Sequence, residues 1–193
     1  MTKKIAIIIG HPNAESFCHS LAANYAKGAE RSGAQVTILD LAEMHFDPIL
    51  HNGYNKRTEL EEDLLHAQRV LLEADHTVWI YPIWWATMPA VLKGFLDRVL
   101  LPGFAFKYTK GKAVPEKLLL GRSARIIATM DSPVWYYRAV LRNSGIYAMK
   151  KGVLEFSGIR PVATTRLGSI GSSTPDKLQR MLELAEHLGQ QQK

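Results

Sequence analysis

Two adjacent tryptophans, Trp84 and Trp85, follow a short apolar run in this 193-residue chain. Residues Thr77–Tyr81 are β-branched or aromatic and have polar flanks, which is typical of a strand buried on both faces. Pro82 ends that strand, and loops at the carboxyl ends of parallel strands are where ligands bind. Two indoles there predict a site for a flat aromatic ligand. The alternative is that they fill the core, but adjacent loop residues rarely both point inward, which favours a functional surface for at least one.

A second candidate site follows the apolar run Lys4–Gly10, which predicts another buried strand. The loop after it contains Ser16 and leads into a helix, with no Lys or Arg before Tyr25. Backbone N–H groups and the helix dipole could hold an anion there without a counter-cation. Capping of the helix by Ser16 explains the residue equally well. His11 alone is weak support, since a lone histidine after a strand is more often a structural hydrogen-bonding residue.

The only cysteine, Cys18, excludes an intrachain disulfide and a cysteine-based zinc site, which fits a reducing cytoplasm. Its place near a helix N-terminus could lower the thiol pKa. We favour a small core residue instead, because no His or Cys partner is evident.

A third loop follows the predicted strand Ala124–Thr129, which ends at the break Met130-Asp131-Ser132-Pro133. Beyond it Trp135, Tyr136 and Tyr137 crowd near two arginines.

The elements that position these loops alternate along the chain. Apolar runs predict strands at 4–10, 35–39, 77–81, 124–129 and 161–167, and helical periodicity predicts helices from Ser16 to about Ser32, near 58–73, 88–100 and 146–156, and from Thr174. Pro161 assigns the last strand to a sheet edge, and Thr87 is the expected cap of the helix that begins at Pro89.

This alternation predicts one α/β domain over residues 1–193, with a five-stranded, parallel, doubly wound sheet in three layers. A dinucleotide-binding fold requires G-x-G-x-x-G after the first strand, and Gly10-His11-Pro12-Asn13 does not match it. The flavodoxin-like order 2-1-3-4-5 instead brings the three candidate loops together.

Charge and hydropathy limit the classes of partner and the cellular location that we expect for the protein. The net charge of +6 comes from scattered Lys and Arg residues, which indicates a solvated basic surface rather than a nucleic-acid site. No run approaches the ~20 apolar residues of a membrane span. The N-terminal apolar run is too short for a signal peptide. We therefore expect a cytoplasmic protein.

Four segments resemble the NAD(P)H:quinone oxidoreductase family, which includes DT-diaphorase-like enzymes, modulator-of-drug-activity proteins and ancillary proteins of potassium efflux antiporters. The matching residues are Gly10-His11-Pro12-x-x-x-Ser16-Phe17, Phe46-Asp47-Pro48, Tyr81-Pro82-Ile83-Trp84-Trp85-x-x-x-Pro89-Ala90-x-Leu92-Lys93-Gly94 and Pro102-Gly103-Phe104-Ala105-Phe106. The resemblance implies a flavodoxin-like fold, bound FAD or FMN, a dimer with the active site at its interface, and hydride transfer from NAD(P)H through flavin to quinones.

The resemblance also implies roles for individual residues. His11, Ser16, Phe17 and Cys18 would surround the flavin phosphate, and Pro82, Ile83, Trp84 and Trp85 would line the isoalloxazine ring. Thr129, Met130, Asp131 and Ser132 replace a Thr-Gly-Gly run of DT-diaphorase-like relatives. We expect the Asp131 side chain to face away from the ring, since it would disfavour an anionic reduced flavin. Tyr136 or Tyr137 is a partial counterpart of the residues that assist hydride transfer, and no metal is required.

Three functions remain open at this level. The leading one is a flavin-dependent NAD(P)H oxidoreductase with a small quinone-like acceptor. An ancillary or regulatory subunit that docks on a membrane cation antiporter is the alternative, and a one-electron carrier is third, because the chain lacks the acidic charge of such carriers. The resemblance favours FAD, with FMN as the alternative. The choice between NADH and NADPH is open, and a homodimer is expected from the family and from the aromatic segments 101–110 and 134–147.

Overall fold

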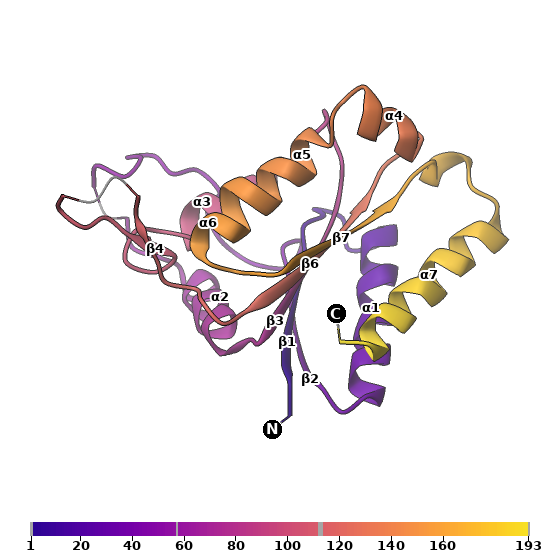
Figure 1. Ribbon diagram of the computed structural model, residues 1–193, viewed down its shortest axis with the longest axis horizontal. Coiled ribbons are helices and arrows are strands. Elements are labelled where there is room, and N and C mark those ends of the chain that lie inside the picture. Colours follow the sequence, from indigo (N-terminus) through magenta and orange to yellow (C-terminus); the bar gives the residue numbers. More distant parts are fainter. Residues whose placement is uncertain (1, 57, 112–113, 193) are drawn as a thin grey trace.

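A five-stranded parallel sheet with the order β2-β1-β3-β6-β7 forms the centre of the molecule (Figure 1). The structure, a computed structural model, describes residues 2–56, 58–111 and 114–192. The strands are β1 (Lys4–Ile9), β2 (Gln35–Asp40), β3 (His76–Pro82), β6 (Ser123–Thr129) and β7 (Val162–Leu167). The short strands β4 (Phe106–Lys107) and β5 (Glu116–Lys117) form a separate antiparallel pair. Counting only the main sheet, this order is the predicted 2-1-3-4-5, so the flavodoxin-like fold class is confirmed.

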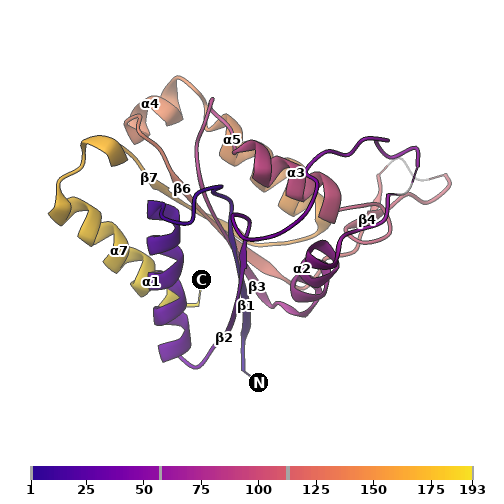
Figure 2. The same ribbon diagram turned by 180° about the vertical axis from the view of Figure 1, so that it is seen from behind.

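Helices cover both faces of this sheet and give the three expected layers (Figures 1 and 2). On one face lie α1 (Phe17–Arg31) and α7 (Pro175–Gln190), which pack with β1 and β3 into one apolar core. The opposite face carries a larger core, built with α2 (Glu62–Glu73), α3 (Ala90–Val99), α4 (Val134–Ala139), α5 (Ser144–Tyr147) and the π-helix η1 (Ala148–Leu154). The short helix α6 (Glu155–Ser157) follows η1. The connection to α7 contains the short 3-10 helix η2 (Ile170–Ser172).

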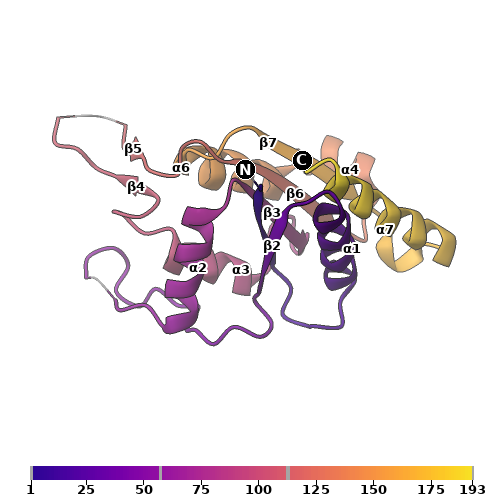
Figure 3. The same ribbon diagram turned by 90° about the horizontal axis from the view of Figure 1, so that it is seen from below.

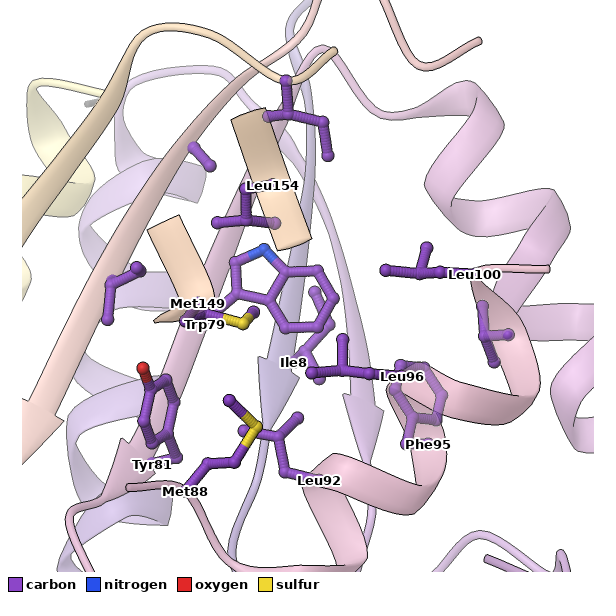
Figure 4. Close-up of a cluster of buried hydrophobic side chains, with 14 of the residues drawn as sticks. Ile8, Trp79, Tyr81, Met88, Leu92, Phe95, Leu96, Leu100, Met149 and Leu154 are labelled. Carbon is purple, nitrogen blue, oxygen red and sulfur yellow. The ribbon is translucent and has the colours of Figure 1, made fainter. Parts of the chain in front are cut away.

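Trp79 of β3 lies at the centre of the larger core. Figure 4 shows its indole among Ile8, Leu96, Met149 and Leu154, and its Nε1 donates a 2.9 Å hydrogen bond to the Thr77 hydroxyl. This packing fixes β3, and therefore the loop at its carboxyl end, relative to the helices α3 and η1. The β4–β5 pair extends away from this body on the side of α2 and α3 (Figure 3).

Three element boundaries differ from the predictions. Helix α2 begins at Glu62 rather than near 58, because the Arg98 guanidinium binds the Glu59 carbonyl oxygen at 3.1 Å and the Glu61 carboxylate at 2.7 Å and holds this segment extended. The predicted helix 146–156 is part of a longer helical segment, 144–157, that contains η1. Strand β7 begins after Pro161, and it lies at the sheet edge as predicted.

No helix within the described part of the chain combines the length and hydropathy that crossing a membrane requires.

Candidate functional site at the carboxyl edge of the sheet

The loops that follow β1, β3 and β6 meet at one edge of the sheet, as the strand order predicts. The Gly10 N–H donates to the carbonyl oxygen of Ile80 at 2.8 Å, and the Ile83 N–H donates to the carbonyl oxygen of Thr129 at 2.7 Å. The three candidate loops are therefore joined by backbone hydrogen bonds directly beyond the strands.

The two tryptophans lie in a tight turn of residues 84–87, which we name the tryptophan turn. Trp84 and Thr87 exchange two backbone hydrogen bonds of 2.9 Å, and Trp85 and Ala86 between them have φ values of +49° and +63°. Positive φ at both central positions defines a type I′ turn. For residues other than glycine this conformation costs about 1–2 kcal/mol each. The turn leaves Trp85 98% exposed and Trp84 43% exposed, so neither indole fills the core.

The sequence predicted Thr87 as the cap of α3, and this prediction is wrong. Pro89 occupies the N-cap position with φ −59° and ψ 151°, and Thr87 closes the tryptophan turn instead.

The carbonyl oxygen of Ala86 fixes the tryptophan turn to the start of α5. It accepts hydrogen bonds from the Gly145 N–H at 3.0 Å, the Ser144 hydroxyl at 3.1 Å and the Tyr137 hydroxyl at 3.4 Å. A Cβ atom at Gly145 would lie 2.6 Å from this oxygen and 2.6 Å from the Thr87 Cα, so the close approach requires glycine. The strained turn is thus held by several contacts from one segment.

Tyr137, one of the two tyrosines predicted to act in hydride transfer, is fully buried. Its hydroxyl accepts a 3.1 Å hydrogen bond from the Ile146 N–H, and burial raises the pKa of this phenol. Direct contact with a substrate is incompatible with this burial, so the prediction of a catalytic Tyr137 is corrected to a positioning role behind Ala86. Tyr136 is 38% exposed and its ring lies edge-on to Trp135, with centroids 5.9 Å apart.

The first loop leads into α1 through Ser16, which occupies the N-cap position in an extended conformation but makes no side-chain cap hydrogen bond. Its hydroxyl instead lies 2.8 Å from Nδ1 of His19, and Nε2 of His19 lies 2.9 Å from the Asp40 carboxylate at the end of β2. His19 was not among the predicted site residues. Its spacing of three residues from Ser16 on a helix was the available signal.

His11 connects the first loop to the tryptophan turn. Its ring lies edge-on to Trp84 with centroids 5.3 Å apart, and 6.5 Å from the ring of His19. Nδ1 accepts a 3.0 Å hydrogen bond from the Asn13 N–H. Burial, with a smaller contribution from the charge of His19, lowers the pKa of His11. A neutral His11 ring therefore stands between the indole and the start of α1.

Phe17 and Cys18 turn their side chains toward the core that α1 builds. Cys18 is 2% exposed, its Sγ lies 3.6 Å from the Thr129 hydroxyl, and burial raises its pKa to about 11. These side chains do not line the open edge. Their N–H groups lie in the first turn of α1, where a helix has no internal partners for them, so a ligand would meet their backbone.

The loop after β6 and the start of the loop after β3 also expose mainly backbone groups at this edge of the sheet. Pro82, Thr129 and Met130 are buried, and Ile83 is half-buried. The Asp131 carboxylate accepts a 3.0 Å hydrogen bond from the Gly171 N–H in η2, and the Ser132 carbonyl oxygen accepts a 3.2 Å hydrogen bond from Ser169. Asp131 is thus engaged by the loop that follows β7. Within the described ranges, no group of three or more His, Cys, Asp or Glu residues is arranged to hold a metal ion.

Known proteins resemble this chain over nearly its whole length. A protein family described by its flavodoxin-like fold matches residues 3–190. An uncharacterized NAD(P)H oxidoreductase of Haemophilus influenzae is 32% identical over 184 residues, which cover 93% of this chain and 90% of that protein. The ribosyldihydronicotinamide dehydrogenase (quinone) of Mus musculus is 30% identical over 190 residues, with coverage of 83% and 79%. The crystal structure of a Streptococcus mutans protein, 33% identical, superimposes with a TM-score of 0.83 over 97% of this chain and 99% of that one.

Proposed function

The chain belongs to the NAD(P)H:quinone oxidoreductase family, and on this basis we propose that it is a flavin-dependent enzyme that transfers hydride from NADH or NADPH, through the flavin, to a quinone or similar electrophilic acceptor. One observation carries the proposal: the strained, exposed tryptophan turn is fixed beside the N-terminus of α1 at the carboxyl edge of the sheet. This edge is where α/β folds bind their cofactors. The oxidoreductase names of the relatives favour an enzyme over the antiporter-subunit alternative.

The donors at this edge fit a flavin. The two hydrogen bonds within the tryptophan turn use the N–H groups of Trp84 and Thr87, so those of Trp85 and Ala86 are offered to the polar edge of an isoalloxazine ring. The indoles offer a flat apolar surface for the ring. Ser16 and the first N–H groups of α1, at Phe17 and Cys18, would hold the flavin phosphate, and His11 would lie between phosphate and ring.

A bound flavin would supply the reversible acceptance of hydride, which no side chain offers. The protein's part is orientation and proton transfer. In this proposal the indole of Trp84 or Trp85 covers one side of the ring and excludes water, and the exposed phenol of Tyr136 contacts the substrate and donates a proton to it. The hydrogen bond from Gly171 to the Asp131 carboxylate supports the expectation that this side chain faces away from the ring.

We further propose that FAD is the flavin, with FMN as the alternative, and that two copies of the chain form the working enzyme. The second copy is supported by large aromatic side chains that a single chain leaves exposed: Trp85, Trp135 and Tyr147 are 98%, 67% and 64% exposed. Aromatic residues are enriched at association surfaces.

The test is the visible absorption spectrum of the purified protein after incubation with FAD or FMN, recorded without oxygen before and after NADH or NADPH and again after a quinone. We expect a flavin band that the coenzyme bleaches and the quinone restores, and chromatography of the released cofactor distinguishes FAD from FMN. A protein that retains neither flavin would overturn the proposal. A flavin that only a chemical reductant bleaches would favour the one-electron carrier.

A further inference from the structure

Arg166 binds the side chain of Asn143, and Arg142 and Arg138 lie one and five residues before Asn143 in the chain; we name these three arginines the arginine cluster. Nε of Arg166 donates to the Asn143 side-chain oxygen at 2.8 Å, and the Asn143 N–H donates to the carbonyl oxygen of Tyr137 at 3.0 Å. Arg142 precedes Asn143 in the chain, and Arg138 follows Tyr137. Asn143 therefore joins Arg166 of β7 to the segment from α4 to α5 that carries Arg138 and Arg142.

The positive charge of this cluster is not neutralised within the described part of the chain. Arg166 donates only to neutral oxygens, those of Asn143 and, at 3.1 Å, the Thr164 hydroxyl, and neither Arg138 nor Arg142 forms an ion pair with a described carboxylate. Burial and the nearby charge of Arg138 lower the pKa of Arg166. Guanidinium groups gathered without acidic partners form a site for an anion.

The cluster is held rigidly beside the tryptophan turn. Arg142 and Asn143 have φ values of +50° and +53°, and the Ser144 N–H closes their turn on the Leu141 carbonyl oxygen at 3.0 Å. The next residues, Ser144 and Gly145, are those that bind the Ala86 carbonyl oxygen. Arg166 is the penultimate residue of β7 and pairs with Ala128, so it also lies at the carboxyl edge of the sheet.

We propose that the arginine cluster binds the 2′-phosphate that distinguishes NADPH from NADH, so that the enzyme selects NADPH. This inference rests on the proposed function. Quinone acceptors are neutral and need no such site. The flavin phosphate has its own donors at the N-terminus of α1, a helix on the opposite face of the sheet from α5 (Figure 1). Among the phosphates of the two coenzymes, the 2′-phosphate is a terminal monoester with a charge of about −2 and three free oxygens, and the planar forks of several arginines match it better than the diphosphate that both coenzymes share.

The first test is kinetic. We expect the unmodified enzyme to have a kcat/KM for NADPH at least tenfold above that for NADH. In Arg138→Ala and Arg142→Ala, whose side chains are exposed, we expect the loss of kcat/KM for NADPH, through KM, to be about tenfold larger than the loss for NADH. Arg180→Ala is the matched control, because it removes the same charge from an exposed position on α7. Equal use of both coenzymes by the unmodified enzyme, or an equal loss for both in the variants, would overturn the inference.

The second test needs no turnover. Calorimetric titration with NADP⁺, NAD⁺, adenosine 2′,5′-bisphosphate and AMP measures the contribution of the 2′-phosphate directly. We expect the two 2′-phosphorylated ligands to bind at least tenfold more tightly than their counterparts, and the Arg138→Ala and Arg166→Gln variants to lose that difference. Equal affinities within each pair contradict the inference. Failure of the protein to hold flavin would instead overturn the proposed function and leave this difference in affinity measurable.

Discussion

The hydroxyl group of Tyr137 lies 3.4 Å from the carbonyl oxygen of Ala86, and the same hydroxyl accepts a 3.1 Å hydrogen bond from the Ile146 N–H. A fully buried phenol thus connects the strained tryptophan turn to the first turn of α5. Gly145 and Ser144 donate to the same carbonyl oxygen, so Tyr137 shares with them the positioning of the turn that carries the exposed indoles.

Removing only the hydroxyl, in Tyr137→Phe, should lower the free energy of unfolding by about 1–2 kcal/mol, because the buried Ile146 N–H loses its acceptor. Flavin affinity should also fall, since the turn becomes less constrained. Urea unfolding and a flavin titration measure the two effects. Tyr147→Phe is the control, because Tyr147 is 64% exposed and should tolerate the change. Equal stability of the two variants would show that the Tyr137 hydroxyl does not stabilise the folded protein.

Cys18 should be unreactive in the folded protein. Its thiol is 2% exposed, and burial raises its pKa to about 11 from 9.0, so about one thousandth of it is thiolate at pH 8. We expect an aromatic disulfide reagent at pH 8 to modify the folded protein at least 100-fold more slowly than the same protein in urea. Rapid modification of the folded protein would mean that α1 opens readily at its N-terminus.

His76 should make the protein less stable in mild acid. Burial lowers its pKa to about 3 from 6.5, and its Nε2 has no hydrogen-bond partner in the described structure. Between these values the unfolded chain binds a proton that the folded chain does not, so stability is full above pH 6.5 and falls as the pH drops toward 3. From pH 7 to pH 5 the loss should be about 2 kcal/mol.

Urea unfolding at pH 7 and pH 5 measures this loss, and His76→Asn should remove most of it while retaining a polar group beside Ser123. His45→Asn, at a side chain that is 97% exposed, should leave the pH dependence unchanged. If His76→Asn lost as much stability between pH 7 and pH 5 as the unmodified protein, other groups would be responsible for the effect.

The fold was predictable because its signals are local. A run such as Ile5–Ile9 must be buried on both faces, and the alternation of such runs with helices leaves few topologies. The start of α2 was not predictable, since it is set by Arg98, which lies 37 residues beyond Glu61 and pairs with it. A helical pattern near residue 58 gives no sign of that partner.

Some features of the site could also be predicted from the sequence, and others depend on tertiary contacts. The adjacency of Trp84 and Trp85 in a loop correctly indicated that at least one indole is exposed. The burial of Tyr137 depends on contacts with Ile146 and Ala86, which only the tertiary structure reveals. The proposed roles of Ser16, Tyr136 and the other flavin contacts remain predictions.

The close approach of α5 to the tryptophan turn gives the sharpest test of how the site is built. In Gly145→Ala the new methyl group would lie 2.6 Å from both the Ala86 carbonyl oxygen and the Thr87 Cα, so the turn must move. We expect a loss of about 1–3 kcal/mol in stability, and at least a tenfold loss of flavin affinity measured by fluorescence titration. Gly152→Ala is the matched control, because a methyl group there meets no atom within 4 Å. If both variants bound flavin as tightly as the unmodified protein, the flavin would not contact the tryptophan turn, and the proposed site would have to be placed elsewhere.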